Sequence, residues 1–289
     1  MIELDGIKAF VTVAACGSFS LAAERLHLTQ PAVSKRIALL ESRMDVRLFD
    51  RIGRTISLTE AGRELEPRAR EILRAVEDTQ RAIGNLSNHV SGQLSLATSH
   101  HIGLWRLPAV LKQYAGQFPD VQLDLHFMDS EIAHEDIVQG KLELGIITLA
   151  PYPHERLTSI PVWRDDLVFM CAPDHPLADQ GTISIEQLAA HPAVLPDMTT
   201  FTGRIVKGLF EKRGVNLKTV MSTNYLETIK MLASIGLGWS VLPKTMLDEH
   251  LVTLDVPGVD IHRNLGIIHH KQRTLSNAAV AFIELLKHE

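Results

Sequence analysis

The first sixty residues repeat apolar positions with the spacing of short helices. One helical face is formed by positions at i, i+3, i+4 and i+7, namely Ile7, Phe10, Val11 and Ala14. Gly17 ends that helix, and Ser18 is placed to cap the next one. Thr29 and Pro31 mark a further helix start, because the hydroxyl can cap it and a proline in the first turn gives up no hydrogen bond. The pattern predicts a helix-turn-helix over residues 18–38.

A hairpin is predicted after these helices. Residues 47–58 hold a turn at Gly53 between two short segments with β-branched side chains. Such a hairpin beside a helix-turn-helix is called a wing. We therefore expect residues 1–58 to fold as a winged helix-turn-helix domain.

Residues 59–88 change to a seven-residue repeat. Mostly apolar or small residues recur at two offsets, namely Leu58, Leu65, Ile72, Thr79 and Leu86, and Gly62, Ala69, Val76 and Ile83. This period is typical of a coiled coil, so residues 59–89 are expected to form a linker helix that pairs two chains. The alternative is a single amphipathic helix packed on its own domain. Pro67 predicts a kink or a local break in this helix.

From residue 91 onward, strands alternate with helices. Strands are expected at 93–98, 121–127, 144–148, 157–163, 166–172, 193–196, 218–222, 238–242 and 262–268. Helices are expected at 103–118, 132–139, 184–189, 201–212, 224–235 and 276–287. This order predicts that residues 90–289 form an α/β domain with mostly parallel sheets and helices on both faces.

The composition fits a soluble chain with more than one core, because 45% of the 289 residues are apolar and 22% are charged. No apolar run has the length of a membrane span and no secretory signal opens the chain, so we expect no membrane partner. Cys16 and Cys171 are the only cysteines, which favours the reducing cytoplasm and two inert thiols. The histidine pairs 100–101 and 269–270 lack metal-ligand spacing, so we expect no metal and no cofactor.

The net charge of −5 is unevenly distributed, and one segment carries an excess of basic residues. Residues 25–54 contain seven Lys or Arg and only three Asp or Glu. Affinity for a polyanion depends on local phosphate neutralisation, so this segment favours nucleic acid as a partner.

The same segment carries a family resemblance. The runs Gly17-Ser18-Phe19-Ser20-Leu21-Ala22-Ala23, Thr29-Gln30-Pro31-Ala32-Val33-Ser34 and Leu58-Thr59 with Ala61-Gly62 resemble the N-terminal domain of LysR-type transcriptional regulators. Shorter phrases at 140–144, 172–178 and 236–243 extend the resemblance, although that family more often has Asp where Glu143 stands.

The second helix of a helix-turn-helix lies in the major groove and reaches base edges with its first residues. Gln can pair with adenine and Lys with guanine, while hydroxyls and arginines suit phosphates or the minor groove. The candidate DNA-binding residues are Ser18, Thr29, Gln30, Pro31, Ser34, Lys35, Arg36, Arg51 and Arg54.

For the second half, the resemblance implies a periplasmic-binding-protein-like fold. One subdomain would comprise residues 91–160 and 265–289, and the other residues 161–264. Ligands of such folds lie between the subdomains, where strands end and helices begin. The candidate effector-binding residues are Thr98, Ser99, His100, His101, Asp129, Ser130, Thr148, Thr200, Phe201, Thr202, Thr223 and Asn224. Helix starts suit anions, so an organic acid or an inorganic anion is the expected effector.

These observations predict a cytoplasmic transcription regulator that is not an enzyme. Its partners would be double-stranded DNA at an interrupted palindrome, a second copy in a homodimer, two dimers in a homotetramer, and possible contact with RNA polymerase. Three alternatives stay open. They are a metabolite-binding enzyme with an incidental N-terminal domain, a ligand-independent architectural DNA-binding protein, and a sensor of oxidative or sulfur stress.

Overall fold

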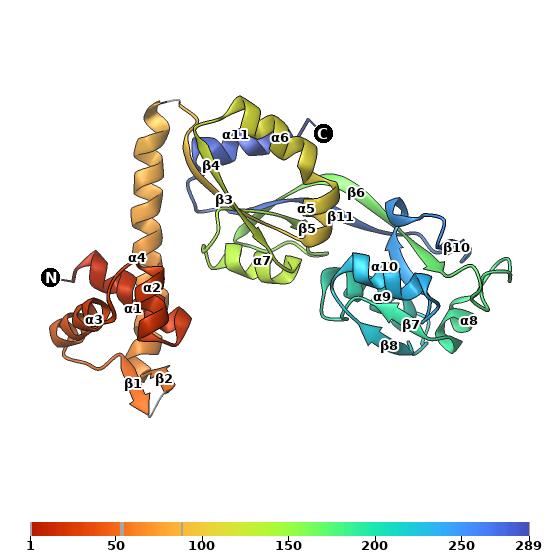
Figure 1. Ribbon diagram of the computed structural model, residues 1–289, viewed down its shortest axis with the longest axis horizontal. Coiled ribbons are helices and arrows are strands. Elements are labelled where there is room, and N and C mark those ends of the chain that lie inside the picture. Colours follow the sequence, from red (N-terminus) through yellow and green to blue (C-terminus); the bar gives the residue numbers. More distant parts are fainter. Residues whose placement is uncertain (1, 53–54, 88, 289) are drawn as a thin grey trace. The chain divides into compact units, whose positions relative to one another are not determined.

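The computed structural model describes residues 2–52, 55–87 and 89–288, and the side chains at 51–55 lie outside its description. The chain divides into two compact units, Met1–Leu86 and Ser87–Glu289. Each unit has its own apolar core. Figure 1 labels most of the helices and strands of both.

The first unit holds three short helices, a hairpin and a long helix. The elements are α1 (Leu4–Cys16), α2 (Phe19–Arg25), α3 (Gln30–Met44), β1 (Phe49–Ile52), β2 (Thr55–Leu58) and α4 (Glu60–Gly84), followed by the 3-10 turn η1 (Asn85–Ser87). Ser18 caps α2 by accepting from the Leu21 N–H, and Thr29 caps α3 by accepting from the Ala32 N–H. Strands β1 and β2 pair antiparallel. The local signals therefore predicted the helix-turn-helix correctly.

Helix α4 has two different halves. It runs from Glu60 to Gly84 with Pro67 inside it, so the local break predicted at the proline does not occur. Leu65 and Ala69 are 8% and 0% exposed because they pack into the core of their own unit. Ile83 near the end of the helix and Leu86 in the 3-10 turn η1 are 65% and 82% exposed. The early residues of the seven-residue repeat therefore pack into the core of their own unit. The exposed residues near its end are the ones that a partner could cover.

The second unit is an α/β structure with further strands and helices. Its strands are β3 (Gly92–Thr98), β4 (Val121–Phe127), β5 (Leu144–Thr148), β6 (Leu157–Cys171), β7 (Ala193–Leu195), β8 (Thr219–Ser222), β9 (Ser240–Pro243), β10 (Val252–Leu254) and β11 (Ile261–His270). Its helices are α5 (His100–Trp105), α6 (Leu107–Gln117), α7 (Ser130–Val138), α8 (Ile185–Ala190), α9 (Phe201–Glu211), α10 (Leu226–Ser234), η2 (Lys244–Met246) and α11 (Asn277–Leu286).

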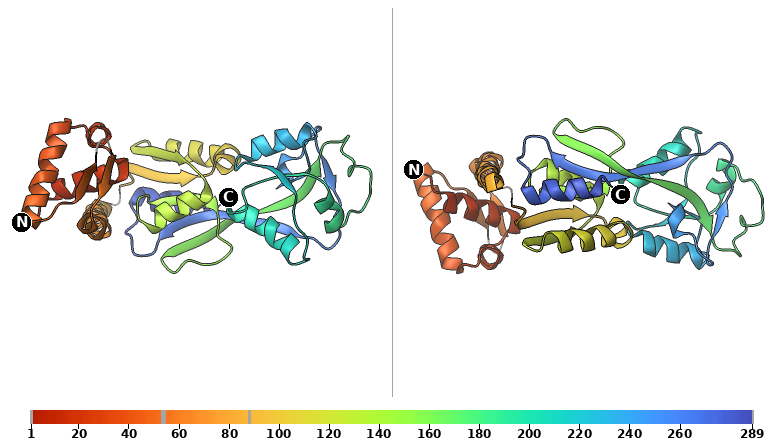
Figure 2. Two further views of the ribbon diagram at one scale, coloured as in Figure 1. Left: turned by 90° about the horizontal axis from the view of Figure 1, so that it is seen from below. Right: turned by 90° about the horizontal axis from the view of Figure 1, so that it is seen from above.

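The main sheet is mixed, which corrects the expectation of mostly parallel sheets. It has the order β10-β6-β11-β5-β3-β4, with β9 also on β6. Only β3 with β4 and β3 with β5 are parallel within it, whereas β11 runs antiparallel to both β5 and β6. A separate parallel pair joins β7 and β8. The two long strands β6 and β11 run through both halves of the unit in Figure 2.

Two element boundaries also differ from the sequence prediction. The strands expected at 157–163 and 166–172 are one strand, β6, because the polar stretch between them pairs with β11. The helix expected at 103–118 is divided at Arg106 into α5 and α6. Pro108 explains that division, since a proline has no N–H to continue the hydrogen bonding of α5.

Each half of the second unit has an aromatic centre. Tyr114 packs edge-on to Phe282 at 5.0 Å between ring centroids, and its hydroxyl donates to the Ala278 carbonyl over 2.7 Å. In the other half, Trp239 stacks on Phe210 at 5.8 Å and its Nε1 donates to the Leu188 carbonyl over 2.8 Å. The partnered polar tips let these large rings be fully buried.

Gly62 provides a test of the packing of α4. A Cβ there would collide with the backbone oxygen of Leu48 and lie 2.9 Å from Leu58 Cδ2. We expect Gly62→Ala to lower the free energy of unfolding by about 1–3 kcal/mol in urea titrations.

Gly84 on the same helix is the matched control, since a Cβ there meets nothing within 4 Å. Gly84→Ala should be neutral or stabilising, because alanine favours helix over glycine. Equal destabilisation by both variants would contradict the close approach at Gly62.

Candidate DNA-binding helix and ligand cleft

The start of α3 presents a polar, exposed edge. Gln30, Pro31 and Lys35 are exposed, and Ser34 is half-buried. On the opposite face, Val33, Ile37 and Leu40 fill the core, which fixes the orientation of the helix. The Gln30 amide donates to Ser34 Oγ over 3.0 Å. This edge offers amide, hydroxyl and ammonium groups together.

The other predicted DNA contacts have different surroundings. Arg36 forms an ion pair with Asp5 at 2.8 Å, so α1 already neutralises part of its charge. The hydroxyls of Ser18 and Thr29 accept from the backbone as helix caps, at 3.3 Å and 3.4 Å. The side chains of Arg51 and Arg54 lie outside the described residues.

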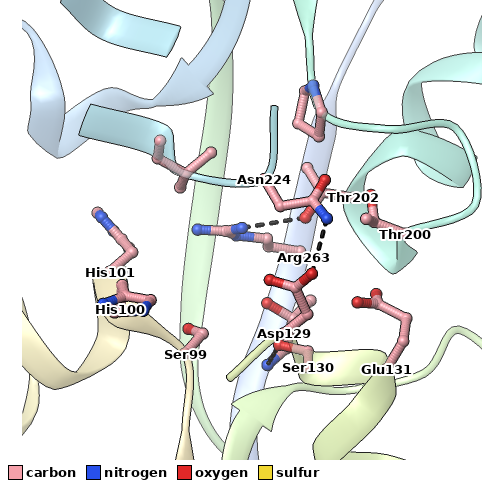
Figure 3. A pocket seen from close by; sticks show the side chains of 13 residues that line it. Ser99, His100, His101, Asp129, Ser130, Glu131, Thr200, Thr202, Asn224 and Arg263 are labelled. Atoms are coloured by element: carbon pink, nitrogen blue, oxygen red, sulfur yellow. Dashed lines mark hydrogen bonds between the residues drawn. The ribbon is translucent and has the colours of Figure 1, made fainter. Parts of the chain in front are cut away.

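The second unit contains a cleft with about 500 Å³ of empty space, including solvent at its mouth. It is lined by Ser99, His100, His101, Asp129, Ser130, Glu131, Thr148, Pro196, Thr200, Thr202, Asn224, Leu226 and Arg263. Figure 3 shows Arg263 between the side chains of the two walls.

The cleft brings together nine of the predicted residues: Ser99, His100, His101, Asp129, Ser130, Thr148, Thr200, Thr202 and Asn224. Its lining does not include Thr98, Phe201 or Thr223. The Phe201 N–H nevertheless donates to Oε1 of the lining residue Glu131. The sequence reasoning missed Glu131, Pro196, Leu226 and Arg263. Arg263 had no distinct local signal, because its strand also contains the polar residues His262, Asn264, His269 and His270.

Three helix starts face the cleft, and a hydroxyl group at each of them accepts a backbone N–H. Ser99 caps α5 by accepting from the Ile102 N–H, and Thr200 caps α9 by accepting from the Gly203 N–H over 2.9 Å. Ser130, at the start of α7, accepts from the Thr148 N–H over 3.1 Å and so ties α7 to β5. These caps place the polar groups where strands end.

Hydrogen bonds span the cleft. Asn224 Nδ2 donates to Asp129 Oδ2 over 2.7 Å, joining the two walls in Figure 3. Glu227 Oε1 accepts from Trp105 Nε1 over 3.0 Å and lies 3.4 Å from His101 Nδ1. The walls are therefore bridged by polar contacts, which a ligand can replace or reinforce.

Arg263 is the cationic centre of the cleft. The β6–β11 register sets it opposite Asp165. Its Nε donates to Asp165 Oδ2 over 2.8 Å and its Nη1 donates to Thr202 Oγ1 over 3.0 Å. Arg106 lies 3.5 Å from the other Asp165 oxygen. Arg263 is 6% exposed, so its orientation is set by these partners.

The charge states beside Arg263 follow from burial. Burial lowers the pKa of His101, and the Arg263 charge lowers it further. For Glu227, burial acts to raise the pKa, but hydrogen bonds from Trp105 and its own backbone outweigh burial and bring that pKa below its ordinary value. The pair is accordingly a neutral imidazole beside a carboxylate near neutral pH.

Among the described residues, neither the Cys171 thiol nor metal-ligating side chains give this site further chemistry. Burial raises the pKa of the Cys171 thiol to about 11, which suppresses the reactive thiolate. Within the described ranges, no cluster of three or more His, Cys, Asp or Glu side chains could hold a metal ion. No helix there is long and apolar enough to cross a membrane.

Comparison with known proteins gives the class and the family. The family model for the bacterial regulatory helix-turn-helix protein, lysR family, matches residues 4–63, and that for the LysR substrate binding domain matches residues 87–289. Together with the capped helix-turn-helix and the cleft, they define a DNA-binding transcription regulator with a small-molecule-binding domain. The chain belongs to the LysR family.

Individual relatives agree with this assignment. The HTH-type transcriptional regulator YeiE of Escherichia coli is 32% identical, over 98% of this chain and 96% of its own length. The fold is similar to that of CbnR in complex with its target DNA, with a TM-score of 0.65 at 22% identity over 99% of both chains. The effector binding domain of QuiR in complex with shikimate has a TM-score of 0.62 at 17% identity, over 68% of this chain and 96% of that one.

Histidine burial predicts how stability depends on pH. Burial is the largest cause that lowers the pKa of His101, His134, His175 and His269 below the ordinary 6.5. The unfolded chain therefore binds more protons than the folded one below this pH, and stability falls as the pH drops through it. We expect the melting temperature to decrease between about pH 7.5 and about pH 5.5.

His134→Gln should make that decrease shallower, because it removes one of these groups. A melting temperature that rises on acidification over this range would contradict the assignment.

Proposed function

We propose that this LysR-family regulator reads duplex DNA with the first turns of α3 and changes its DNA binding when a small molecule occupies the cleft. The observation that carries the proposal is the exposed polar edge of α3, held outward by a fully buried apolar face. An exposed, capped helix start with Gln and Lys suits the major groove.

The proposed DNA contacts divide by chemistry. Gln30, Ser34 and Lys35 would reach base edges, since they share the exposed edge of α3. Ser18, Thr29 and Arg36 would hold phosphates, with Pro31 shaping the helix start, and Arg51 and Arg54 would extend from the wing. The likeness to the DNA-bound CbnR supports this arrangement.

We further propose a homodimer that pairs through the later half of α4. Ile72, Ile83 and Leu86 are 42%, 65% and 82% exposed. Such a row of exposed apolar side chains marks a surface that a partner can bury. Two copies would place two helix-turn-helix domains on an interrupted palindrome. Two dimers would form a tetramer, and contact with RNA polymerase would follow at the promoter.

The ligand would act through the cleft between two subdomains. The proposed domain limits are 1–58, 59–89 and 90–289, with subdomains at 91–160 plus 265–289 and at 161–264. All twelve predicted effector-binding residues lie in the cleft or next to it in sequence. A small molecule can shift DNA binding only by its difference in affinity for two arrangements of the subdomains. The likeness to shikimate-bound QuiR supports a small-molecule ligand.

We also propose that the chain is not an enzyme and that it works in the cytoplasm. Its relatives are transcription regulators. Two thiols, one of them fully buried, agree with a reducing compartment.

Two substitutions in α3 test the DNA interface. Lys35→Ala should cost about 1–3 kcal/mol on the operator and relax the preference for guanine at one position, as expected for a lost base contact. Gln30→Ala should cost about 1–3 kcal/mol on the operator and relax the preference for one base. Gel shifts with the operator and its single-base variants measure both.

Arg43→Ala is the matched control, because Arg43 lies in the last turn of α3 and is paired with Glu3 at 2.6 Å. It should bind the operator like the unchanged protein. If Lys35→Ala and Gln30→Ala both bind operator and random duplex like the unchanged protein, α3 is not the recognition helix.

A charge placed in the exposed row of α4 tests the dimer. Ile83→Glu should shift the protein from dimer to monomer in sedimentation experiments, because paired helices would bury the new carboxylates together. Ala82→Glu adds the same charge one position away, at an exposed residue outside the repeat, and should leave the dimer intact. Dimers that survive Ile83→Glu would rule out this seam.

A further inference from the structure

Two buried nitrogens of the cleft lack a hydrogen-bond partner among the described residues. They are Arg263 Nη2 and His101 Nε2, on residues that are 6% and 5% exposed. Both residues line the cleft, and they come from different elements, β11 and α5. Buried polar groups without partners are rare because leaving them unpaired is costly, so each points to a ligand atom.

Arg263 needs a hydrogen-bond acceptor. A guanidinium group only donates, and its other nitrogens already donate to Asp165 and Thr202. Figure 3 shows the guanidinium group extending between the labelled side chains of the cleft. The remaining Nη2 therefore requires an oxygen that accepts, for which a carboxylate is the strongest common choice.

His101 needs a hydrogen-bond donor. Its Nδ1 lies 3.4 Å from Glu227 Oε1, which also accepts from Trp105. A carboxylate cannot donate, so Nδ1 carries the ring proton and Nε2 of the neutral ring presents its lone pair. Burial and the charge of Arg263 lower the pKa of His101, which keeps the ring neutral near pH 7.

We propose that the ligand of this cleft is a small carboxylic acid with an O–H or N–H group on the carbon next to the carboxylate. The carboxylate accepts from Arg263 Nη2, and the adjacent group donates to His101 Nε2. This inference rests on the proposed function, since it names the chemistry of the effector. Hydroxy acids and amino acids share this chemistry, and the experiment separates them.

The rest of the lining agrees with a ligand that donates as well as accepts. Asp129 and Glu131 bring two carboxylates to the cleft, and each also accepts from the opposite wall, from Asn224 and from the Phe201 N–H. Carboxylates repel a bare polyanion but accept from hydroxyl or ammonium groups. The helix-capping residues Ser99 and Thr200 add two hydroxyl groups to the lining.

Isothermal titration of the full-length protein with matched acids tests the proposal. One series is lactate, alanine, pyruvate and propionate, and the other is malate, aspartate, oxaloacetate and succinate, with sulfate added. We expect the hydroxy or the amino member of a series to bind about tenfold tighter, or more, than its keto and unsubstituted counterparts, because only the former satisfies His101. Which of the two binds tighter identifies the ligand as a hydroxy acid or an amino acid.

Two variants assign the two contacts. His101→Phe should abolish the preference for the hydroxy or amino member while the unsubstituted acid keeps its affinity, which general damage to the fold would not do. Arg263→Gln should weaken every acid at least tenfold. Arg164→Gln is the control, since Arg164 is exposed on β6, bonds Asp166 and Asp260, and is absent from the cleft lining.

The proposal is overturned if the keto or unsubstituted acids bind as well as their partners, if sulfate alone binds, or if no acid binds. If Arg263→Gln does not fold, the acid selectivity of the unchanged protein and of His101→Phe still tests the proposal. A gel shift on the same preparation tests the proposed function separately from the ligand chemistry. Loss of duplex binding refutes the proposed function, whereas intact duplex binding without acid selectivity refutes only the ligand chemistry.

Discussion

The buried pair of Asp165 and Arg263 joins the two long strands of the ligand-binding unit beside the cleft. The two side chains are 1% and 5% exposed and bond at 2.8 Å, between strands that run through both halves. Removing two charges from water is expensive unless their hydrogen-bonding groups are used. Thr202 and Arg106 supply two more contacts, and one guanidinium nitrogen remains. Because side chains alternate along a strand, a slip of one residue would turn Arg263 to the other face of the sheet and remove it from the cleft.

The same constraint connects fold and ligand. Arg263 lies on β11, Thr202 in α9 and Arg106 between α5 and α6, so elements of both halves meet at one charge. A molecule that satisfies the remaining nitrogen changes the balance of contacts across the cleft, including those of Asp129 with Asn224. Differential contacts of this kind are what allow a ligand to favour one arrangement over another.

Helix α4 shows how one sequence repeat can serve two purposes. Leu65 and Ala69 complete the core of the DNA-binding unit, and the close contact at Gly62 positions the helix beside Leu48. From Ile72 onward, Ile72, Ile83 and Leu86 of the same repeat are exposed, whereas Val76 is half-buried. A heptad pattern thus reports which residues avoid water, and the fold of the unit decides which of them are covered from within.

The sequence by itself determined the features that depend on a few neighbouring residues. The caps at Ser18 and Thr29 and the apolar stripe of α3 were readable, because each acts within one or two helical turns. Nine cleft residues were found because polar groups follow strand ends. Arg263, Glu131 and the antiparallel course of β6 and β11 came only from the tertiary structure. Arg263 and Asp165 are 98 positions apart, and their contact depends on the pairing register of two long strands. Such pairing is a non-local balance of packing and burial, which no short stretch of sequence encodes.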